Sequence, residues 1–354
     1  MSLQQFGWGA FFQALWVDHS LCPARVIAQG GSRFLVHDGS RELRASIRGR
    51  LCDQENFPPV VGDWVGLSLS DTGRDAENSC VIEEILARRT AIVRKQAGRT
   101  FGAQVLAANV DRVVLMMAMD QDFSLHRLER YLTLVWDSGA TPIIVLSKAD
   151  LANDPSLLSR EAEKRAMGFP VICLSNVSGQ GRPELDSVLQ PGETIVLLGS
   201  SGVGKSTLVN ALGGAGLRRT GAIRQSDGKG RHTTTDRHLI RLPSGVLVID
   251  TPGMREVQLW AGEDSLEQTF AEIADLAAGC RFRDCRHQGE PGCAVAEAVD
   301  RGEIAADRLE SFHQLRAEIR HLERQSDPRK ASEHKSEVKK IHRAQKQHYK
   351  MRRK

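Results

Sequence analysis

Residues 199–207 read GSSGVGKST, and this stretch decides the fold of the domain that contains it. From Gly199 to Ser206 it fits G-x-x-x-x-G-K-[ST], the pattern of a phosphate-binding loop. The apolar run ETIVLLG before it predicts a buried strand, and STLVNALGG after it predicts a helix. Such a loop binds phosphates through its backbone N–H groups and the helix N-terminus. The sequence therefore predicts a nucleotide-binding α/β domain built around this loop.

Two residues of the loop and one later motif are expected to bind the phosphates and Mg²⁺. Lys205 would reach the β- and γ-phosphates as a catalytic residue, and the Ser206 hydroxyl would bind Mg²⁺. DTPG, at 250–253, ends the apolar run SGVLVI. Asp250 can hold Mg²⁺ through water there, and the N–H of Gly253 can contact the γ-phosphate. The pattern predicts a nucleoside triphosphatase but does not select the base.

The base is selected upstream, where SKAD at 147–150 ends the apolar run TPIIVLS. The Asp150 carboxylate can accept hydrogen bonds from N1–H and N2–H₂ of guanine, donors that adenine lacks there, and the Lys148 stem can lie over the base. The LSN that ends the next predicted strand can contact guanine O6 near Ser175 and Asn176. A Lys–Asp surface turn is common by itself, but at a strand end in this kind of sheet it predicts guanine specificity.

These motifs resemble the five motifs of GTPases, in a rotated order. The usual order is phosphate loop, switch threonine, DxxG, [NT]KxD and a serine-led base loop, whereas here SKAD and LSN come before the phosphate loop. We therefore expect a circularly permuted GTPase whose DTPG loop, switch II, leads directly into a C-terminal domain. The residues expected to contact GTP are Ser147, Lys148, Ala149, Asp150, Ser175, Asn176, Gly199, Ser200, Ser201, Gly202, Val203, Gly204, Lys205, Ser206, Thr207, Asp250 and Gly253.

The glutamine that orients the attacking water in many GTPases has no counterpart here, because Met254 stands in its position. His232, within GKGRHTTTDRH, is the candidate for that role; an exposed loop histidine or an RNA contact explains it equally well. Thr234 is the candidate for the second Mg²⁺ hydroxyl, with Thr233 and Thr235 as alternatives.

A cluster near the C-terminus has the donor set of a zinc site. Cys280, Cys285, His287 and Cys293 give C-x₄-C-x-H-x₅-C, three thiolates and one imidazole. Four filled positions make a closed, structural Zn²⁺ site. Three arginines lie among the ligands and are suited to grip phosphates: Arg281, Arg283 and Arg286.

The composition along the chain predicts a multidomain protein. Residues 1–20 are an N-terminal segment whose aromatic residues we expect to pack as a helix on a neighbouring domain. Residues 21–92 carry five short strands, typical of an N-terminal OB-fold β-barrel, although an SH3-like barrel gives the same pattern. Residues 93–260 alternate strands and helices, as a doubly wound P-loop GTPase domain does. Residues 261–325 predict a helical zinc-binding domain, and 326–354 a basic flexible tail.

The net charge of +4 is unevenly distributed. Residues 323–354 hold 12 Lys or Arg and 4 Asp or Glu, a net +8, which leaves −4 on the rest of the chain. This tail favours an RNA partner, with a merely solubilising role as the alternative. Arg44, Arg48 and Arg50 suit a nucleic-acid face or a solvated strand face equally.

We expect a monomeric cytoplasmic protein with no membrane partner. No run of 18 apolar residues occurs, and the N-terminus lacks the basic region and cleavage site of a signal peptide. Clustered cysteines in such a protein more often bind metal than form disulfides.

Barrel, permuted GTPase, Cys₃His loop and basic tail, in this order, resemble the RsgA (YjeQ) family of small-ribosomal-subunit GTPases. The specific marks are GSSGVGKST, the GRHTTT run at 230–235, DTPG and the cysteine spacing. The resemblance implies an N-terminal OB-fold and GTP hydrolysis with Mg²⁺, stimulated by the 30S subunit. It also implies late 30S maturation with 16S rRNA contacts, and a catalytic role for His232. Ser147 departs from the usual Asn, which would hold the loop less firmly, and Asn176 replaces the usual Ala, which would crowd the base.

Two other classes of function compete with a ribosome-assembly enzyme. An RNA-binding scaffold that uses GTP only to hold its shape is compatible with Met254. An ATP-using kinase or repair enzyme is disfavoured by Asp150. Turnover with and without 30S subunits tests the first alternative, and nucleotide competition tests the second.

Overall fold

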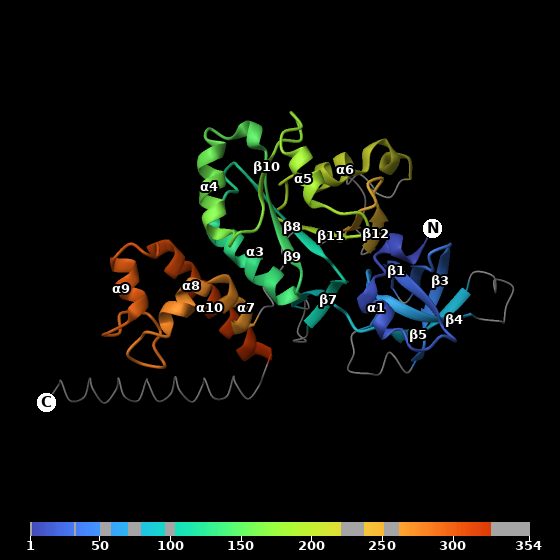
Figure 1. Ribbon diagram of the computed structural model, residues 1–354, viewed down its shortest axis with the longest axis horizontal. Coiled ribbons are helices and arrows are strands. Elements are labelled where there is room, and N and C mark those ends of the chain that lie inside the picture. The colour runs from blue at the N-terminus through green and yellow to red at the C-terminus, as the bar shows by residue number, and fades with distance from the viewer. Residues whose placement is uncertain are drawn as a thin grey trace. The chain divides into compact units, whose positions relative to one another are not determined.

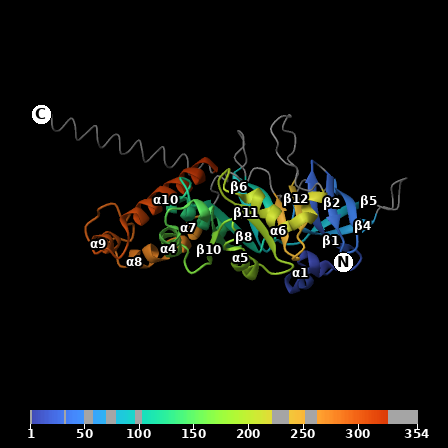
Figure 2. The same cartoon turned by 90° about the horizontal axis from the view of Figure 1, so that it is seen from above.

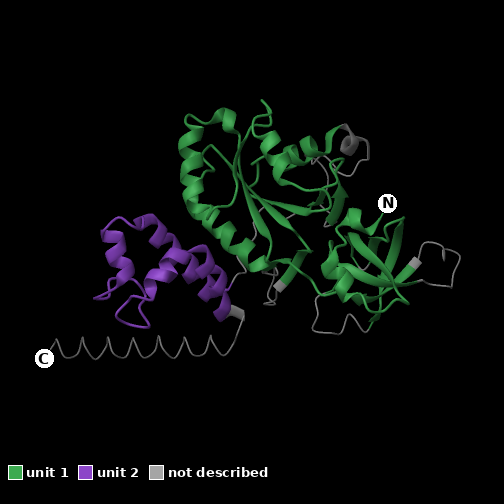
Figure 3. Ribbon diagram, viewed as in Figure 1, with its two compact units in different colours: residues 1–94, 104–258 green, residues 95–103, 259–354 purple. Residues whose placement is uncertain are grey.

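A computed structural model describes residues 2–31, 33–49, 58–69, 79–95, 103–220, 237–250 and 262–326. The chain divides into two compact units, residues 1–94 with 104–258 and residues 95–103 with 259–354 (Figure 3). The first unit contains all the nucleotide motifs, and the second contains the cysteine cluster. The predicted basic tail, residues 326–354, lies outside the described residues from residue 327 onward. The predicted domain bounds stay a prediction.

The predicted N-terminal barrel is confirmed. Its five strands are β1 (Cys22–Gly30), β2 (Arg33–His37), β3 (Glu42–Ile47), β4 (Trp64–Leu69) and β5 (Ser79–Ile85). They pair in the order β1-β2-β3-β5-β4, and β4 closes the barrel by pairing with β1 (Figure 1). Only the β3–β5 pairing is parallel. Alternate strand residues such as Val26, Phe34 and Ile82 fill the interior, the period-two pattern of half-buried strands.

The aromatic N-terminal segment packs on this barrel. It forms a short 3₁₀ helix, η1 (Leu3–Phe6), and the helix α1 (Ala10–Leu15). The rings of Trp8 and Phe12 contact Trp64, which is fully buried at the start of β4. The segment thus covers one end of the barrel core, as its apolar residues predict.

The GTPase sheet has five parallel strands and one antiparallel strand. The parallel strands run in the order β10 (Val171–Leu174), β9 (Thr141–Ser147), β8 (Arg112–Ala118), β11 (Thr194–Leu198) and β13 (Leu247–Asp250). The antiparallel strand β12 (Arg237–Arg241) pairs with β13 on one side and with β1 of the barrel on the other. Barrel and GTPase strands therefore form one continuous eleven-stranded sheet. Figure 2, seen from above, shows β12 between β11 and the barrel strands.

Helices cover both faces of the parallel strands (Figure 1). They are α3 (Leu125–Ser138), α4 (Pro155–Arg165), α5 (Arg182–Val188) and α6 (Lys205–Thr220). Val114 and Met116 of β8 pack in one core cluster with Leu185 of α5 and Leu208 of α6. Their neighbours along β8 point to the opposite face and are also buried. Burial on both faces explains why these strands read as continuous apolar runs.

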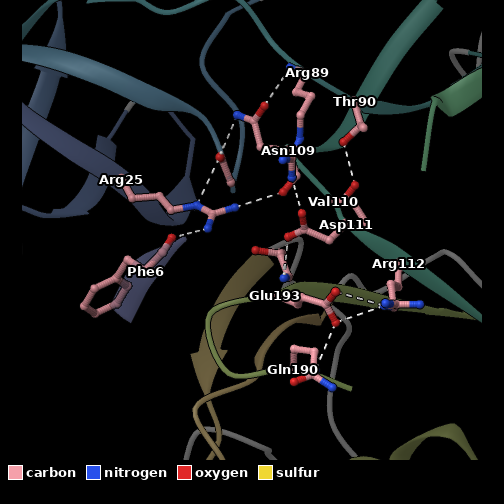
Figure 4. Close-up of polar contacts among 12 residues, drawn as sticks. Phe6, Arg25, Arg89, Thr90, Asn109, Val110, Asp111, Arg112, Gln190 and Glu193 are labelled. Carbon is pink, nitrogen blue, oxygen red and sulfur yellow. Dashed lines mark hydrogen bonds and ion pairs between the residues drawn. The ribbon is translucent and has the colours of Figure 1, made fainter. Parts of the chain in front are cut away.

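A polar network joins the barrel to the amino ends of the GTPase strands (Figure 4). The guanidinium of Arg25, in β1, is 1% exposed and donates to the carbonyls of Phe6, Gly62 (3.2 Å) and Asn109 (3.1 Å). Gly62 has a φ of 98°, and a Cβ there would lie 2.0 Å from the carbonyl oxygen of Ala108. This close approach requires glycine. The network lies at the edge of the sheet opposite the nucleotide motifs.

Several elements of the first unit were not predicted. The strands β6 (Ala91–Lys95) and β7 (Ala103–Ala108) pair in a separate two-stranded sheet. Neither α5 nor β12 was expected from the sequence.

The second unit is helical. It contains α7 (Glu263–Thr269), α8 (Ala271–Ala277), α9 (Ala294–Asp300) and α10 (Ala306–Ser326). The stretch from Glu263 to Ala277 forms two helices and not one, because Phe270 leaves the helical conformation (φ −119°, ψ 46°). Its ring is fully buried and lies 5.5 Å from that of Phe312, on the apolar stripe of α10. Burying Phe270 against α10 thus accompanies the break.

Within the part of the chain that the structure describes, we find no helix long and apolar enough to cross a bilayer.

Candidate nucleotide site and metal centre

The phosphate loop connects β11 to α6, as its sequence predicts. Gly199 opens it with a φ of 150°, and a Cβ there would lie 2.2 Å from the carbonyl oxygen of Met116 in β8. Only glycine can turn the chain so close to the neighbouring strand. The Lys205 ammonium donates to the carbonyls of Gly199 and Ser200, each at 2.6 Å. It therefore lies curled inside the loop, where an incoming phosphate would meet it.

Ser147 ties the base-selecting motif to the phosphate loop. Its hydroxyl, 1% exposed at the end of β9, donates to the carbonyl of Val203 at 2.7 Å. The carbonyl of Met117 lies 3.4 Å away. One hydroxyl thus connects β9 to the phosphate loop, with a single strong hydrogen bond.

Lys148 is held beside the same loop by a partner that the sequence analysis missed. Its backbone has a left-handed φ of 57°, and its ammonium forms an ion pair of 2.9 Å with Asp120. The hydrogen bond from Lys148 lowers the pKa of Asp120, and the backbone N–H of Asp122 adds to this effect. A polar residue directly after the buried strand β8 was the available signal, since the carboxyl ends of parallel strands meet at one edge.

Asp150 and the loop after β10 also lie together. The carboxylate of Asp150 accepts a hydrogen bond of 2.5 Å from the hydroxyl of Ser175, which is fully buried. The Ser175 hydroxyl in turn accepts from the backbone N–H groups of Val177 and Ser178, each at 3.2 Å. The amide nitrogen of Asn176 lies 3.6 Å from the position of a Cβ on Gly204. Both expected base-contacting segments therefore border the phosphate loop.

A second unpredicted cluster braces the phosphate loop from α3. Arg127, in the first turn of that helix, donates to the hydroxyl of Ser200 at 2.6 Å and forms an ion pair with Asp122. Next to these residues is a cavity of about 400 Å³, lined by Asp120, Lys148, Ser201 and Gly202 among others. The cavity is of the size of a ligand pocket.

Some of the remaining predicted contact residues lie in the described part of the chain, and the others lie outside it. Ser206 and Thr207 are exposed in the first turn of α6, and Asp250 is exposed at the end of β13. The residues Gly253, Met254, His232 and Thr233 to Thr235 lie outside the described residues. Ala149 is buried beneath the turn that carries Asp150.

The cysteine cluster has the geometry of a four-ligand metal site. The four donor atoms of Cys280, Cys285, His287 and Cys293 lie within 4.8 Å of one another. Cys293 Sγ is 4.0 Å from Cys280 Sγ and 3.4 Å from His287 Nδ1. Bonds of about 2.3 Å to sulfur and 2.0 Å to nitrogen place tetrahedral zinc ligands roughly 3.5–3.8 Å apart. The donor set and spacing therefore fit Zn²⁺.

The surroundings of His287 favour its metal-binding form. Burial lowers the pKa of His287, and the charge of Arg316 lowers it further, so the imidazole is neutral at neutral pH. The neutral ring is the form that binds metal. His287 has a φ of 59°, and its carbonyl lies 3.2 Å from Nε2 of His313. The Glu290 carboxylate accepts from the N–H of Gln288 at 2.7 Å and shapes the loop between the last two ligands.

Curated proteins are similar to this chain over most of its length. The small ribosomal subunit biogenesis GTPase RsgA of Opitutus terrae is 41% identical, over 98% of this chain and 97% of its own. RsgA 2 of Lactiplantibacillus plantarum is 46% identical, over 83% of this chain and 82% of its own. The family model described as RsgA GTPase matches residues 85–260. The chain belongs to the RsgA GTPase family.

Solved structures of this family confirm the architecture. YjeQ from Thermotoga maritima matches with a TM-score of 0.62 and 28% identity, over 84% of this chain and 98% of its own. YloQ, described as a circularly permuted GTPase, matches with a TM-score of 0.60 and 27% identity, over 86% of this chain and 96% of its own. The predicted rotated motif order is thus a property of this family. An ABC transporter model also matches residues 184–351, a range that includes the phosphate loop.

Membership of the RsgA GTPase family establishes GTP hydrolysis as the activity, with Mg²⁺ as the metal that accompanies the nucleotide. The predicted enzyme class, the predicted fold and the predicted family are confirmed. The individual contacts to GTP and Mg²⁺ stay predictions.

Proposed function

We propose that this chain binds the 30S ribosomal subunit through 16S rRNA and hydrolyses GTP to GDP and phosphate during late small-subunit maturation. The observation that carries the proposal is similarity over nearly the whole chain to proteins named small ribosomal subunit biogenesis GTPases. The matched region includes the barrel, the edge of the sheet that carries the nucleotide motifs, and the Cys₃His cluster. The proposed function therefore involves all three parts of the chain.

In this proposal the carboxyl edge of the sheet binds GTP. Lys205 turns from its loop carbonyls to the β- and γ-phosphates, while Ser206 and Thr234 supply hydroxyls for Mg²⁺. Bound Mg²⁺ would supply charge neutralisation at the phosphates. Asp150, oriented by Ser175, accepts the guanine N–H donors. Ser147 keeps the base-binding turn at a fixed distance from the phosphate loop.

The attacking water is oriented by His232 in the proposed mechanism. Met254 has neither a donor nor a strong acceptor for a water molecule, so another group must perform this step. Because this glutamine is missing, we expect GTP hydrolysis by the protein alone to be slow. The 30S subunit would stimulate turnover by fixing the residues around His232.

The route from the nucleotide to the second unit is short. Asp250 ends β13, and the second unit begins at residue 259. A γ-phosphate contact at Gly253 would therefore act only a few residues from the zinc-binding unit. The metal loop, residues 280–293, carries the exposed Arg281, Arg283 and Arg286. These arginines can bind rRNA phosphates.

Binding to the subunit tests this proposal before any kinetics. Cosedimentation with purified 30S subunits is measured with a non-hydrolysable GTP analogue, with GDP and without nucleotide. We expect the analogue to strengthen association, and added salt to weaken it in all three states. Equal association in all three states would refute the coupling of switch II to the second unit.

A further inference from the structure

The zinc-binding unit contains a cavity of about 250 Å³ that the nucleotide chemistry does not use. At roughly 30 Å³ for each water it has room for about eight water molecules, which suits one planar heterocycle. Residues of α7, α8, α10 and the metal loop line it; those that matter below are Glu263, Glu267, Phe282, Arg283 and Arg316.

Phe282 is an exposed aromatic wall of this cavity. Its side chain is 42% exposed, and it lies between two zinc-ligand cysteines. The N–H of Cys285 donates to its carbonyl at 3.2 Å, and that of Arg281 donates to Gly292 at 3.0 Å. The metal loop therefore presents the ring on a fixed backbone. The guanidinium of Arg281 lies 5.5 Å from the centroid of this ring. An exposed aromatic ring is a stacking surface for a nucleic-acid base.

The charges around the cavity are divided in the way a nucleotide requires. Arg283 of the metal loop lines the cavity, and Arg281 and Arg286 are exposed on the same loop. Glu263 and Glu267 line it from α7, and Arg316 lines it from α10, 3.9 Å from Glu263. Glu263 is already paired with Arg320 at 3.0 Å, whereas Glu267 is exposed beside the cavity. An RNA phosphate is attracted to the arginines, and a base amino group is attracted to a carboxylate.

We propose that this cavity binds one unpaired base of single-stranded RNA, stacked on Phe282. The loop arginines hold the adjoining phosphate, and Glu267 accepts a hydrogen bond from an exocyclic amino group, as of cytosine. The inference rests on the proposed RNA partner and adds the place and the type of nucleotide that the second unit recognises. Because uracil has no amino group, cytosine is preferred over uracil.

The test is fluorescence anisotropy with the full-length, zinc-loaded protein at raised salt, where binding by basic residues is weak but stacking remains. The probes are short fluorescein-labelled oligocytidine, oligouridine, and the oligocytidine strand annealed to its complement. We expect affinity in the order oligocytidine, oligouridine, duplex. Phe282→Leu should weaken binding of oligocytidine about ten-fold or more, and Phe282→Tyr should retain it.

Matched variants separate stacking from damage to the metal loop. Phe11→Leu changes an equally exposed ring in the first unit, 41% exposed, and should bind as the unchanged protein does. Glu267→Ala should remove the preference for cytosine while retaining stacking. Zinc content is measured for each variant and should stay at one ion.

Equal binding of oligocytidine by Phe282→Leu and the unchanged protein would overturn the inference, as would equal affinity for duplex and single strand. Stimulation of GTP turnover by 30S subunits is measured on the same samples. Absence of stimulation in the unchanged protein would refute the proposed function. Normal stimulation together with unchanged oligocytidine binding in Phe282→Leu would refute only the base-binding cavity.

Discussion

At the scale of single residues, we propose that Asp150 determines which nucleotide the site accepts. Its carboxylate is placed by the hydroxyl of Ser175 and lies beside the phosphate loop. Asp150→Asn replaces one acceptor oxygen with an NH₂ donor, which faces the guanine N2–H₂ group. Two charge-assisted hydrogen bonds are weakened, so GTP affinity should fall by about 100-fold or more. Competition binding measures this.

Xanthosine triphosphate provides the matched control for that substitution, since its C2 carbonyl can accept from the new amide. The variant should bind this nucleotide better than the unchanged protein does. Unchanged affinity for GTP in Asp150→Asn would show that another group selects the base.

Ser147 is the residue whose role the sequence described least well. The departure from Asn suggested a loosely held loop, and the structure shows one hydrogen bond from Ser147 to Val203. Ser147→Ala leaves that carbonyl without this donor and should weaken GDP binding by about five-fold. Ser147→Asn should at least restore it. Isothermal titration calorimetry compares GDP binding by the unchanged protein, Ser147→Ala and Ser147→Asn. Equal affinities would show that the Ser147 hydroxyl does not contribute to nucleotide binding.

His287 makes the zinc-binding unit sensitive to acid. Burial lowers its pKa below the ordinary 6.5, so the unfolded chain binds more protons than the folded one between the two values. Stability from this residue is therefore complete above pH 6.5 and is lost as the pH falls toward the lower value. Zinc release, followed with a coloured chelator, should rise as the pH falls, because a protonated imidazole cannot bind the metal. Release that is independent of pH from neutral to mildly acidic would contradict this.

At the scale of elements, Arg25 joins three segments that are distant in the sequence. Its guanidinium donates to carbonyls of the N-terminal segment, the barrel and Asn109, directly after β7 (Figure 4). Burial lowers its pKa to about 10, so it remains charged at neutral pH. Arg25→Met leaves buried carbonyls without donors and should lower the free energy of unfolding of the first unit by about 3 kcal/mol.

Arg41→Met is the control for that substitution, because the Arg41 side chain is 56% exposed. It should change the unfolding free energy little. Denaturant unfolding followed by tryptophan fluorescence compares both variants with the unchanged protein. Equal midpoints for Arg25→Met and Arg41→Met would show that the buried network adds no stability.

The elements that the sequence predicted are those with strong periodicity. The runs at β9 and β11 are apolar except at their ends, because both faces of these strands are buried. The barrel strands alternate because only one face is buried. These patterns depend on neighbours along the chain, so a single sequence reveals them.

What the sequence did not reveal depends on contacts between distant segments. Pairing of β12 with β1 joins residues 237 and 29, which no local pattern links. The break at Phe270 follows from packing against Phe312. Asp120 and Arg127 gained their roles only when strand ends came together at the phosphate loop.

At the scale of the whole molecule, the zinc-binding unit should unfold independently of the GTPase unit. Binding of the four ligands couples metal affinity to folding. Cys285→Ser, or removal of metal with a chelator, should therefore abolish one thermal transition and leave the transition of the first unit in place. Cys173→Ala, outside the cluster, should retain zinc and both transitions. Differential scanning calorimetry with zinc analysis distinguishes these outcomes. A single thermal transition that shifts to lower temperature when zinc is lost would refute independent unfolding of the two units.

GTP turnover by the purified protein, alone and with 30S subunits, tests the central claim most directly, with ATP as the control nucleotide. We expect a slow basal rate that rises strongly with 30S subunits, and little turnover of ATP. In that case His232→Ala should lose most of the stimulated rate. A GTP rate unchanged by 30S subunits would contradict a ribosome-gated GTPase and would favour a scaffold that holds GTP without using it.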